Sequence, residues 1–201
     1  MAIVQTNSGR IFLSNAKRLL VTPYTDEDTV GSTTYDIISI VADTLSITPD
    51  DNTINTRDWE FGDTPLYETV TLGKVQFAAT CIDLQNTILE KIFGWTLDSN
   101  GNVFMPKTYV DKYASIVVEF ADETDPTIVL PKVKMNSKVV LASLKTGSAE
   151  GQLAGTAYVA KAGSASSALT ESSMGFISNE NADEIYIDGG DGTAVNVLAE
   201  E

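Results

Sequence analysis

Carboxylates offer most of the reactive chemistry in this 201-residue chain, because it contains no histidine and a single cysteine, Cys81. Histidine is the side chain that most often acts as a general base near neutral pH, and it is the commonest transition-metal ligand. Its absence excludes serine–histidine and cysteine–histidine catalytic arrangements. One cysteine can form neither an intramolecular disulfide nor a cysteine-cluster zinc site. We interpret Cys81 as a buried, unreactive thiol.

Acidic residues cluster at Asp26 to Asp28, at Asp50 and Asp51, and at Asp188 and Asp191. Paired carboxylates can perform acid–base catalysis, but both pairs lie in predicted solvated turns, which do not favour it. The first cluster does not have the spacing of a calcium loop. The last turn lacks the Gly-Lys-Ser/Thr of a phosphate-binding loop and occurs once, whereas calcium β-rolls repeat their nonapeptide. We therefore predict no catalytic residue, no cofactor and no metal site, and we expect that the protein is not an enzyme.

The chain is strongly acidic, with a formal net charge of −15 and only 13 Lys and Arg residues. This balance disfavours a protein that clamps nucleic acid, since neutralising phosphates requires clustered basic residues. An acidic surface can still line a passage to which DNA must not stick. A hydrophobic content of 43% is enough for one domain with a core. No apolar run approaches the ~20 residues of a membrane span, and residues 1–10 do not resemble a signal segment, so we expect synthesis in the cytoplasm and no membrane partner.

Alternating apolar residues predict a series of strands in the first half of the chain. Tyr35 to Thr48 is expected to form one long strand, in which the apolar parity changes near Asp43, as at a bulge or where a strand leaves the core to join a protruding hairpin. Pro49 to Asn52 has the composition of a turn. Return strands are predicted at Ile54 to Phe61 and at Leu66 to Leu72.

One amphipathic helix is predicted over Cys81 to Phe93, directly after a short alternating strand from Lys74 to Thr80. Thr80 and Asp83 have the spacing of a capping box, and Gly94 suits a left-handed helix end. The expected apolar stripe recurs at helical spacing and consists of Cys81, Leu84, Ile88, Leu89, Ile92 and Phe93.

The second half of the chain is predicted to be rich in β-structure. Asn100-Gly101 indicates a hairpin between Trp95 and Met105. Further strands are expected at 114–120, 127–135, 139–144 and 152–160, with Pro131 marking an edge or a kink. Residues 162–173 read as an Ala/Gly/Ser-rich linker, and a small hairpin is predicted from Ile185 to Leu198.

Five strings resemble the tail tube (major tail) proteins of long-tailed bacteriophages, across about residues 35 to 160. They are Val41 to Thr48, Trp59 to Asp63, Leu72 to Ala79, Leu130 to Lys134 and Gly151 to Ala157. The resemblance implies an antiparallel, mainly β fold, sandwich or barrel-like, flanked by the helix at about residues 81–93. It also implies a tail-tube-like β domain over residues 1–160 with an N-terminal arm at about 1–13. Residues 161–201, the linker and terminal hairpin, would be an appendage or part of the same domain.

The same resemblance implies a structural virion protein, assembled in the cytoplasm of a host bacterium. Its partners would be other copies of itself, in hexameric rings that stack into a tube, other tail proteins, and DNA that passes through the lumen without specific binding. In that family a hairpin loop, here Thr48 to Thr56, and the N-terminal arm, here Met1 to Leu13, bridge adjacent rings. The expected subunit-contact residues are therefore Ile3, Val4, Ile11, Phe12, Leu13, Pro49, Asp50, Asp51, Asn52 and Ile54. A tube protein of a contractile injection or secretion system, and a non-catalytic surface or adhesin-like β-domain, are the alternative interpretations.

Overall fold

The computed structural model describes residues 16–25, 30–37, 39–58, 65–82, 84–106, 112–122, 125–140, 149–160, 173–178, 186–188 and 194–196. In these residues the protein is mainly β with one short helix, and its paired strands are antiparallel, which confirms the predicted class. The N-terminal arm, the Trp59 to Asp63 string and most of the predicted linker lie outside the described residues.

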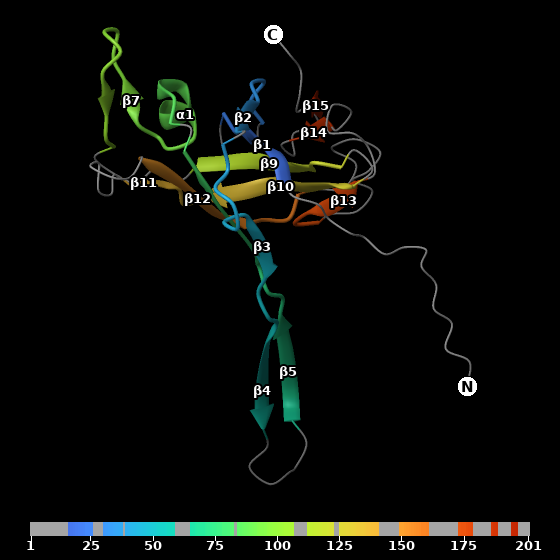
Figure 1. The fold of residues 1–201 in the computed structure, drawn as a ribbon. Helices are drawn as coiled ribbons and strands as arrows, with labels where there is room; N and C mark the ends of the chain where they lie inside the picture. The colour runs from blue at the N-terminus through green and yellow to red at the C-terminus, as the bar shows by residue number, and fades with distance from the viewer. Residues whose placement is uncertain are drawn as a thin grey trace.

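A nine-stranded antiparallel sheet forms the body of the protein (Figure 1). Seven strands follow the order β2-β1-β9-β10-β12-β6-β3, while β11 pairs with β12 and β13 pairs with β10. Within the described residues the two end strands, β2 and β3, do not pair with each other, so the sheet is open rather than a closed barrel. The strands are β1 (Ala16–Pro23), β2 (Tyr35–Ile37), β3 (Ser46–Pro49), β6 (Val75–Cys81), β9 (Lys112–Phe120), β10 (Thr127–Met135), β11 (Lys138–Val140), β12 (Glu150–Ala157) and β13 (Phe176–Ser178).

The core lies mainly on one face of this sheet, because the strands alternate between buried and more exposed positions. In β12 every second residue is buried, and β6 follows the same pattern through Phe77, Ala79 and Cys81. A smaller apolar cluster, formed by Leu20, Val30, Val117 and Val129, covers part of the opposite face. Because β1, β9 and β10 contribute to both clusters, their central residues are buried on both sides; the larger cluster includes Leu19, Val21, Ile37, Phe77, Ile116, Val118, Leu130, Val133 and Leu153.

Strand β10 contains Pro131 but lies inside the sheet, between β9 and β12. Its register with β9 shifts between Leu130 and Val133, so the proline occupies an irregularity in the ladder. A proline has no N–H to donate, and it is tolerated within a sheet at such positions. Pro131, predicted to mark an edge or a kink, is not at an edge of the described sheet and instead marks an irregularity in the pairing with β9.

The helix begins later than predicted. α1 spans Asn86–Lys91, and Cys81 is the last residue of β6, where it pairs with Gly151 of β12. Thr80 also lies in the strand, and Gln85 takes the N-cap position without a side-chain capping bond, so the predicted capping box at Thr80 is wrong. The period-two burial of β6 extends to Cys81, and pairing with β12 outweighs the local helix signal.

The end of the helix agrees with the sequence. Gly94 has a φ of 75°, the left-handed conformation predicted for it. Ile88, Leu89, Ile92 and Phe93 are buried in the main core cluster, so this part of the predicted stripe does face the sheet. α1 therefore acts as a cover for the core.

Three hairpins extend from or accompany the sheet. β7 (Thr96–Leu97) and β8 (Val103–Phe104) form the predicted hairpin, with Gly101 at a φ of 83°. β14 (Tyr186–Asp188) pairs with β15 (Ala194–Asn196), which confirms the predicted terminal hairpin. The third, β4 (Thr53–Asp58) with β5 (Pro65–Thr71), projects away from the sheet (Figure 1).

Candidate assembly interface

The projecting β4–β5 hairpin is a direct extension of the sheet. At its base, β3 pairs with β6 from Ser46↔Ala78 to Pro49↔Val75. Further out, β4 pairs with β5, beginning at Thr53↔Thr71. Both strands of the hairpin advance by four residues between the last pair of the base and the first pair of the projection. The two ladders therefore share one register. Strands β3–β6 and β4–β5 therefore form one long ribbon, which we call the projecting ribbon.

The junction between the two halves of the projecting ribbon is tied by hydrogen bonds. The Asp50 N–H donates to the Lys74 carbonyl at 2.7 Å, and the Gly73 N–H donates to Asn52 Oδ1 at 2.9 Å. Gln76 Nε2 donates to Asp50 Oδ2 at 2.9 Å. A Cβ at Gly73 would overlap the Asp50 carbonyl oxygen, so the chains approach here as closely as only glycine allows.

This junction corrects the expected position of the loop. The segment Thr48 to Thr56 was predicted to form the loop at the end of the hairpin, but it runs from the sheet through the junction into β4. The chain reverses between Asp58 and Pro65, because β4 and β5 are antiparallel. Pro49 to Asn52 therefore lie at the base of the projection. Asn52 and Asp50 hydrogen-bond across the ribbon instead of reversing the chain.

The apolar side chains of the projecting ribbon change face between its two halves. In a regular antiparallel ribbon, directly paired residues and residues two apart share a face. At the base the face that contains Phe77 is buried against the core. In the projecting half the apolar residues whose side chains are described occupy the other face. They remain exposed, by 59% for Ile54, 50% for Val70 and 69% for Leu72, and we call these three the hairpin stripe.

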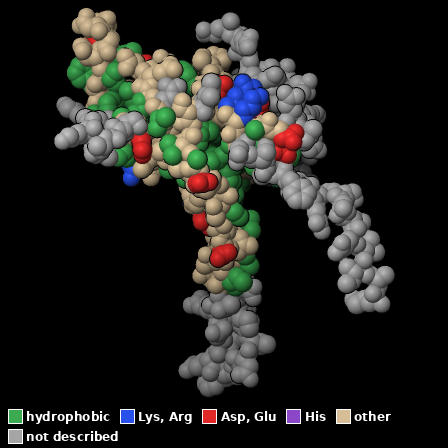
Figure 2. Space-filling view, in the orientation of Figure 1, with side chains coloured by type: hydrophobic (Ala, Val, Ile, Leu, Met, Phe, Trp, Pro, Cys, Tyr) green, Lys and Arg blue, Asp and Glu red, His purple; other side chains and the backbone are tan. Residues whose placement is uncertain are grey.

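The hairpin stripe does not contact the described hydrophobic core of its own subunit. Figure 2 shows hydrophobic side chains on the projection below the sheet, beyond the main body of the molecule. Of the residues predicted to contact another subunit, Ile54 belongs to this stripe, whereas Val70 and Leu72 were missed. Their signal was the alternation of Leu66 to Leu72, which predicted a strand but did not say which face is covered. Ile3, Val4, Ile11, Phe12 and Leu13 lie outside the described residues.

The single long strand expected over Tyr35 to Thr48 is wrong, because β2 and β3 lie at opposite ends of the sheet. The irregular stretch before β3 contains Asp43, near which the change of parity was predicted. Asp43 has a φ of 61°, and three more residues separate Ile40 from Ser46 than separate their partners on β6. Thr44 supports this excursion, since its hydroxyl donates to the Val41 carbonyl at 2.6 Å and accepts from the Thr80 N–H at 3.0 Å. The ribbon therefore leaves the sheet from a fixed base.

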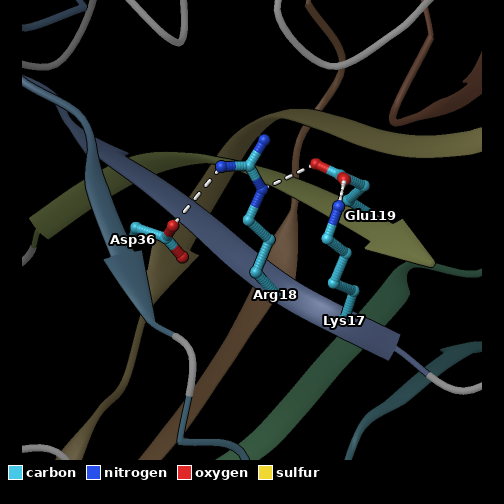
Figure 3. Close-up of polar contacts among 4 residues, drawn as sticks. All are labelled: Lys17, Arg18, Asp36 and Glu119. Atoms are coloured by element: carbon cyan, nitrogen blue, oxygen red, sulfur yellow. Dashed lines mark hydrogen bonds and ion pairs between the residues drawn. The ribbon is translucent and has the colours of Figure 1, made fainter. Parts of the chain in front are cut away.

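A cluster of charges stabilises the sheet away from the projection (Figure 3). Glu119 on β9 accepts from Lys17 Nζ at 2.8 Å and from Arg18 Nε at 2.6 Å, and Arg18 also reaches Asp36 on β2 at 3.4 Å. Burial by itself raises the pKa of Glu119, but the hydrogen bonds from Lys17 and Arg18 outweigh it and hold the pKa below its ordinary value. The cluster joins β1, β2 and β9, and we interpret it as structural.

Groups suited to catalysis or metal binding are scarce in the described residues. Among them, no three or more His, Cys, Asp or Glu side chains are placed to hold a metal ion. Cys81 is buried in the core. The pKa of Asp98, in the β7–β8 turn, is lowered because its carboxylate accepts from the Asn102 side-chain amide and from the backbone N–H groups of Asn102 and Asn100, each at 2.8 Å. The carboxylate thus orders its own turn.

Comparisons with known proteins do not assign this chain to a family. The chain matches no protein-family model, and a search of curated proteins finds no significant match. In the described part of the chain, the single helix is too short and too polar to cross a membrane.

Proposed function

We propose that this protein is a structural subunit that assembles with copies of itself into a tube, as the tail tube proteins of long-tailed bacteriophages do. In this proposal six subunits form a ring, rings stack into a tube, and DNA passes through the channel without specific binding. The protein would be assembled in the cytoplasm of a host bacterium and would become part of the virion tail, next to other tail proteins. It would catalyse no reaction.

The observation that carries the proposal is the change of face along the projecting ribbon. A hairpin that served only its own subunit would place its apolar residues toward the core or expose polar residues on both faces. Here Ile54, Val70 and Leu72 lie on the face that does not continue the core, and each is at least half exposed. Clustered exposed apolar side chains of this kind mark interaction surfaces.

Three further features support an assembly. Within the described residues, β2 and β3 end the sheet with edges that no other described strand pairs, and an unpaired sheet edge can pair with another chain. The net charge of −15 suits the wall of a channel for DNA, because like charge prevents phosphates from adhering. The sequence strings described above are similar to those of tail tube proteins.

The test is to follow the purified full-length protein over a range of concentrations. Negative-stain electron microscopy and light scattering after size exclusion are expected to show rings or tubes as the concentration rises. A protein that stays strictly monomeric at millimolar concentration would exclude the proposal. Replacing Ile54 and Leu72 together with Thr should weaken assembly, whereas Ile177→Thr is the matched control, since Ile177 is 51% exposed on β13.

A further inference from the structure

An apolar pocket lies at the foot of the β7–β8 hairpin, where α1, β10 and β11 meet. It is a cavity of about 200 Å³ that opens to solvent. An apolar cavity of about 150 Å³ is enough to hold a group the size of benzene, so this one can accept a leucine-sized side chain. Its apolar lining includes Phe93, Trp95, Met135 and Val139.

The pocket carries positive charge and a hydrophobic rim. Lys112 and Lys138 contribute to its lining, and none of the described lining residues is acidic. Lys112 is held in place, because its Nζ donates to the Glu90 carbonyl at 3.0 Å and to the Lys91 carbonyl at 3.2 Å. On the adjoining β7–β8 hairpin, Phe104 is 53% exposed, and Met105, which also lines the pocket, is 64% exposed.

We propose that this pocket receives the hairpin stripe of a second copy of the protein. The inference rests on the proposed function and adds to it the surface that the projecting ribbon contacts. Size and polarity agree, since the stripe presents exposed aliphatic side chains and the pocket offers an apolar floor. Charge agrees as well: residues 50–74, which include the stripe, contain six acidic residues and two basic ones, whereas the pocket contributes two lysines.

The arrangement of the two surfaces determines what such a contact would build. Figure 1 shows that β4–β5 and β7–β8 project from the body of the molecule in opposite directions. A contact between two different surfaces of identical subunits is heterologous. Because the stripe and the pocket are different surfaces, a pair of copies still has one free stripe and one free pocket, so the contact can repeat from copy to copy. The pocket and the stripe therefore favour head-to-tail stacking over a closed dimer.

Cysteine trapping with two separate variants of the full chain tests this contact directly. Leu72→Cys protein and Val139→Cys protein are mixed in equal amounts under mild oxidation, while Cys81 remains buried. The expected product is a disulfide-linked dimer that contains one copy of each variant. Ile177→Cys mixed with Val139→Cys is the matched control, because Ile177 is exposed but lies outside the stripe. Trapping no greater than in this control would overturn the inference.

A charge exchange provides the second test. Glu68 lies on β5, two residues before Val70 of the hairpin stripe. Lys138→Glu and Glu68→Lys should each raise the concentration needed for assembly, by about tenfold, and the double variant should recover most of that loss. Lys91→Glu is the control, since Lys91 is on α1 near the pocket but does not line it. Circular dichroism melts check that each variant is folded. Single losses without recovery in the double variant would count against a direct contact.

The pocket contact and the proposed assembly into a tube can be tested separately. If the wild-type protein forms rings or tubes but neither trapping nor charge recovery occurs, the pocket is not the receiving surface, and the tube proposal stands. If the wild-type protein does not assemble at any concentration, the proposed function fails, and the inference fails with it.

Discussion

Replacing Gly73 with Ala should loosen the projecting ribbon while leaving the core folded. The added methyl would overlap the Asp50 carbonyl oxygen, so the two chains must separate at the junction. That separation breaks the Asp50 to Lys74 bond of 2.7 Å and the Gly73 to Asn52 bond of 2.9 Å. At 0.5–1.5 kcal/mol for each hydrogen bond, the ribbon should lose about 1–3 kcal/mol, or roughly 5- to 150-fold in its opening equilibrium.

Native-state hydrogen exchange measures this loss residue by residue. The amides of β4 and β5 should lose protection by that factor in Gly73→Ala, whereas the amides of β9 and β10 should keep theirs, because the junction is remote from the core. Thr71→Ala is the control: it changes a nearby exposed residue of β5 that is outside the hairpin stripe, without adding an atom at the close approach. If Gly73→Ala leaves β4 and β5 as well protected as the control does, the close approach does not hold the ribbon.

Three other substitutions test the body of the fold. Gly151→Ala should destabilise the protein by about 1–3 kcal/mol in denaturant unfolding, because the new Cβ would lie 2.5 Å from Phe93 Cζ; an unchanged midpoint would contradict that packing. Ser115→Ala should raise the free energy of unfolding by about 1 kcal/mol, since Ser115 Oγ is buried with no hydrogen-bond partner in the described structure, and a clear loss of stability would reveal a missing partner. Glu119→Gln should cost about 1 kcal/mol at neutral pH. Because the pKa of Glu119 is lowered in the folded state by Lys17 and Arg18, its contribution is present above the unfolded pKa and is lost as the pH falls through the folded pKa. Stability of the wild type should therefore fall toward that of Glu119→Gln under acid, and parallel pH profiles would refute the assignment.

Local sequence signals predicted the elements better than their boundaries. Local signals were sufficient to predict β9, β12 and the Asn100-Gly101 turn, because each of these elements has a clear pattern in its own residues. Cys81 was assigned to the helix because it fits the helical stripe, yet it equally continues the alternation of Phe77 and Ala79. Only the partner strand decides between the two periods, and β12 pairs with β6 through Cys81.

The position of the hairpin end was wrong for a related reason. Two segments have the composition of a turn, Pro49 to Asn52 and Gly62 to Pro65. In the first segment, Asn52 and Asp50 hydrogen-bond to the opposite strand and the ribbon continues, although residues of these types often occur where a chain reverses. Composition identifies residues that are tolerated where strand pairing is interrupted. It does not distinguish an interruption within a hairpin from the turn at its end. The pocket was not predicted, because its residues come from separate elements whose packing no local pattern describes.

The sequence nevertheless contains a change of apolar parity that indicates a second contact surface. Leu72 and Val75 are three residues apart, and an odd separation along an unbroken ribbon places them on opposite faces. Phe77 shares the face of Val75 and is buried, whereas Val70 shares the face of Leu72 and is exposed. A change of parity can result from a bulge, which would return both sets to one buried face, or from two different surfaces that cover the two halves. The advance of four residues on each strand from Pro49↔Val75 to Thr53↔Thr71 excludes an extra residue on one strand alone, and we infer that the outer half is patterned for a surface that its own subunit does not provide.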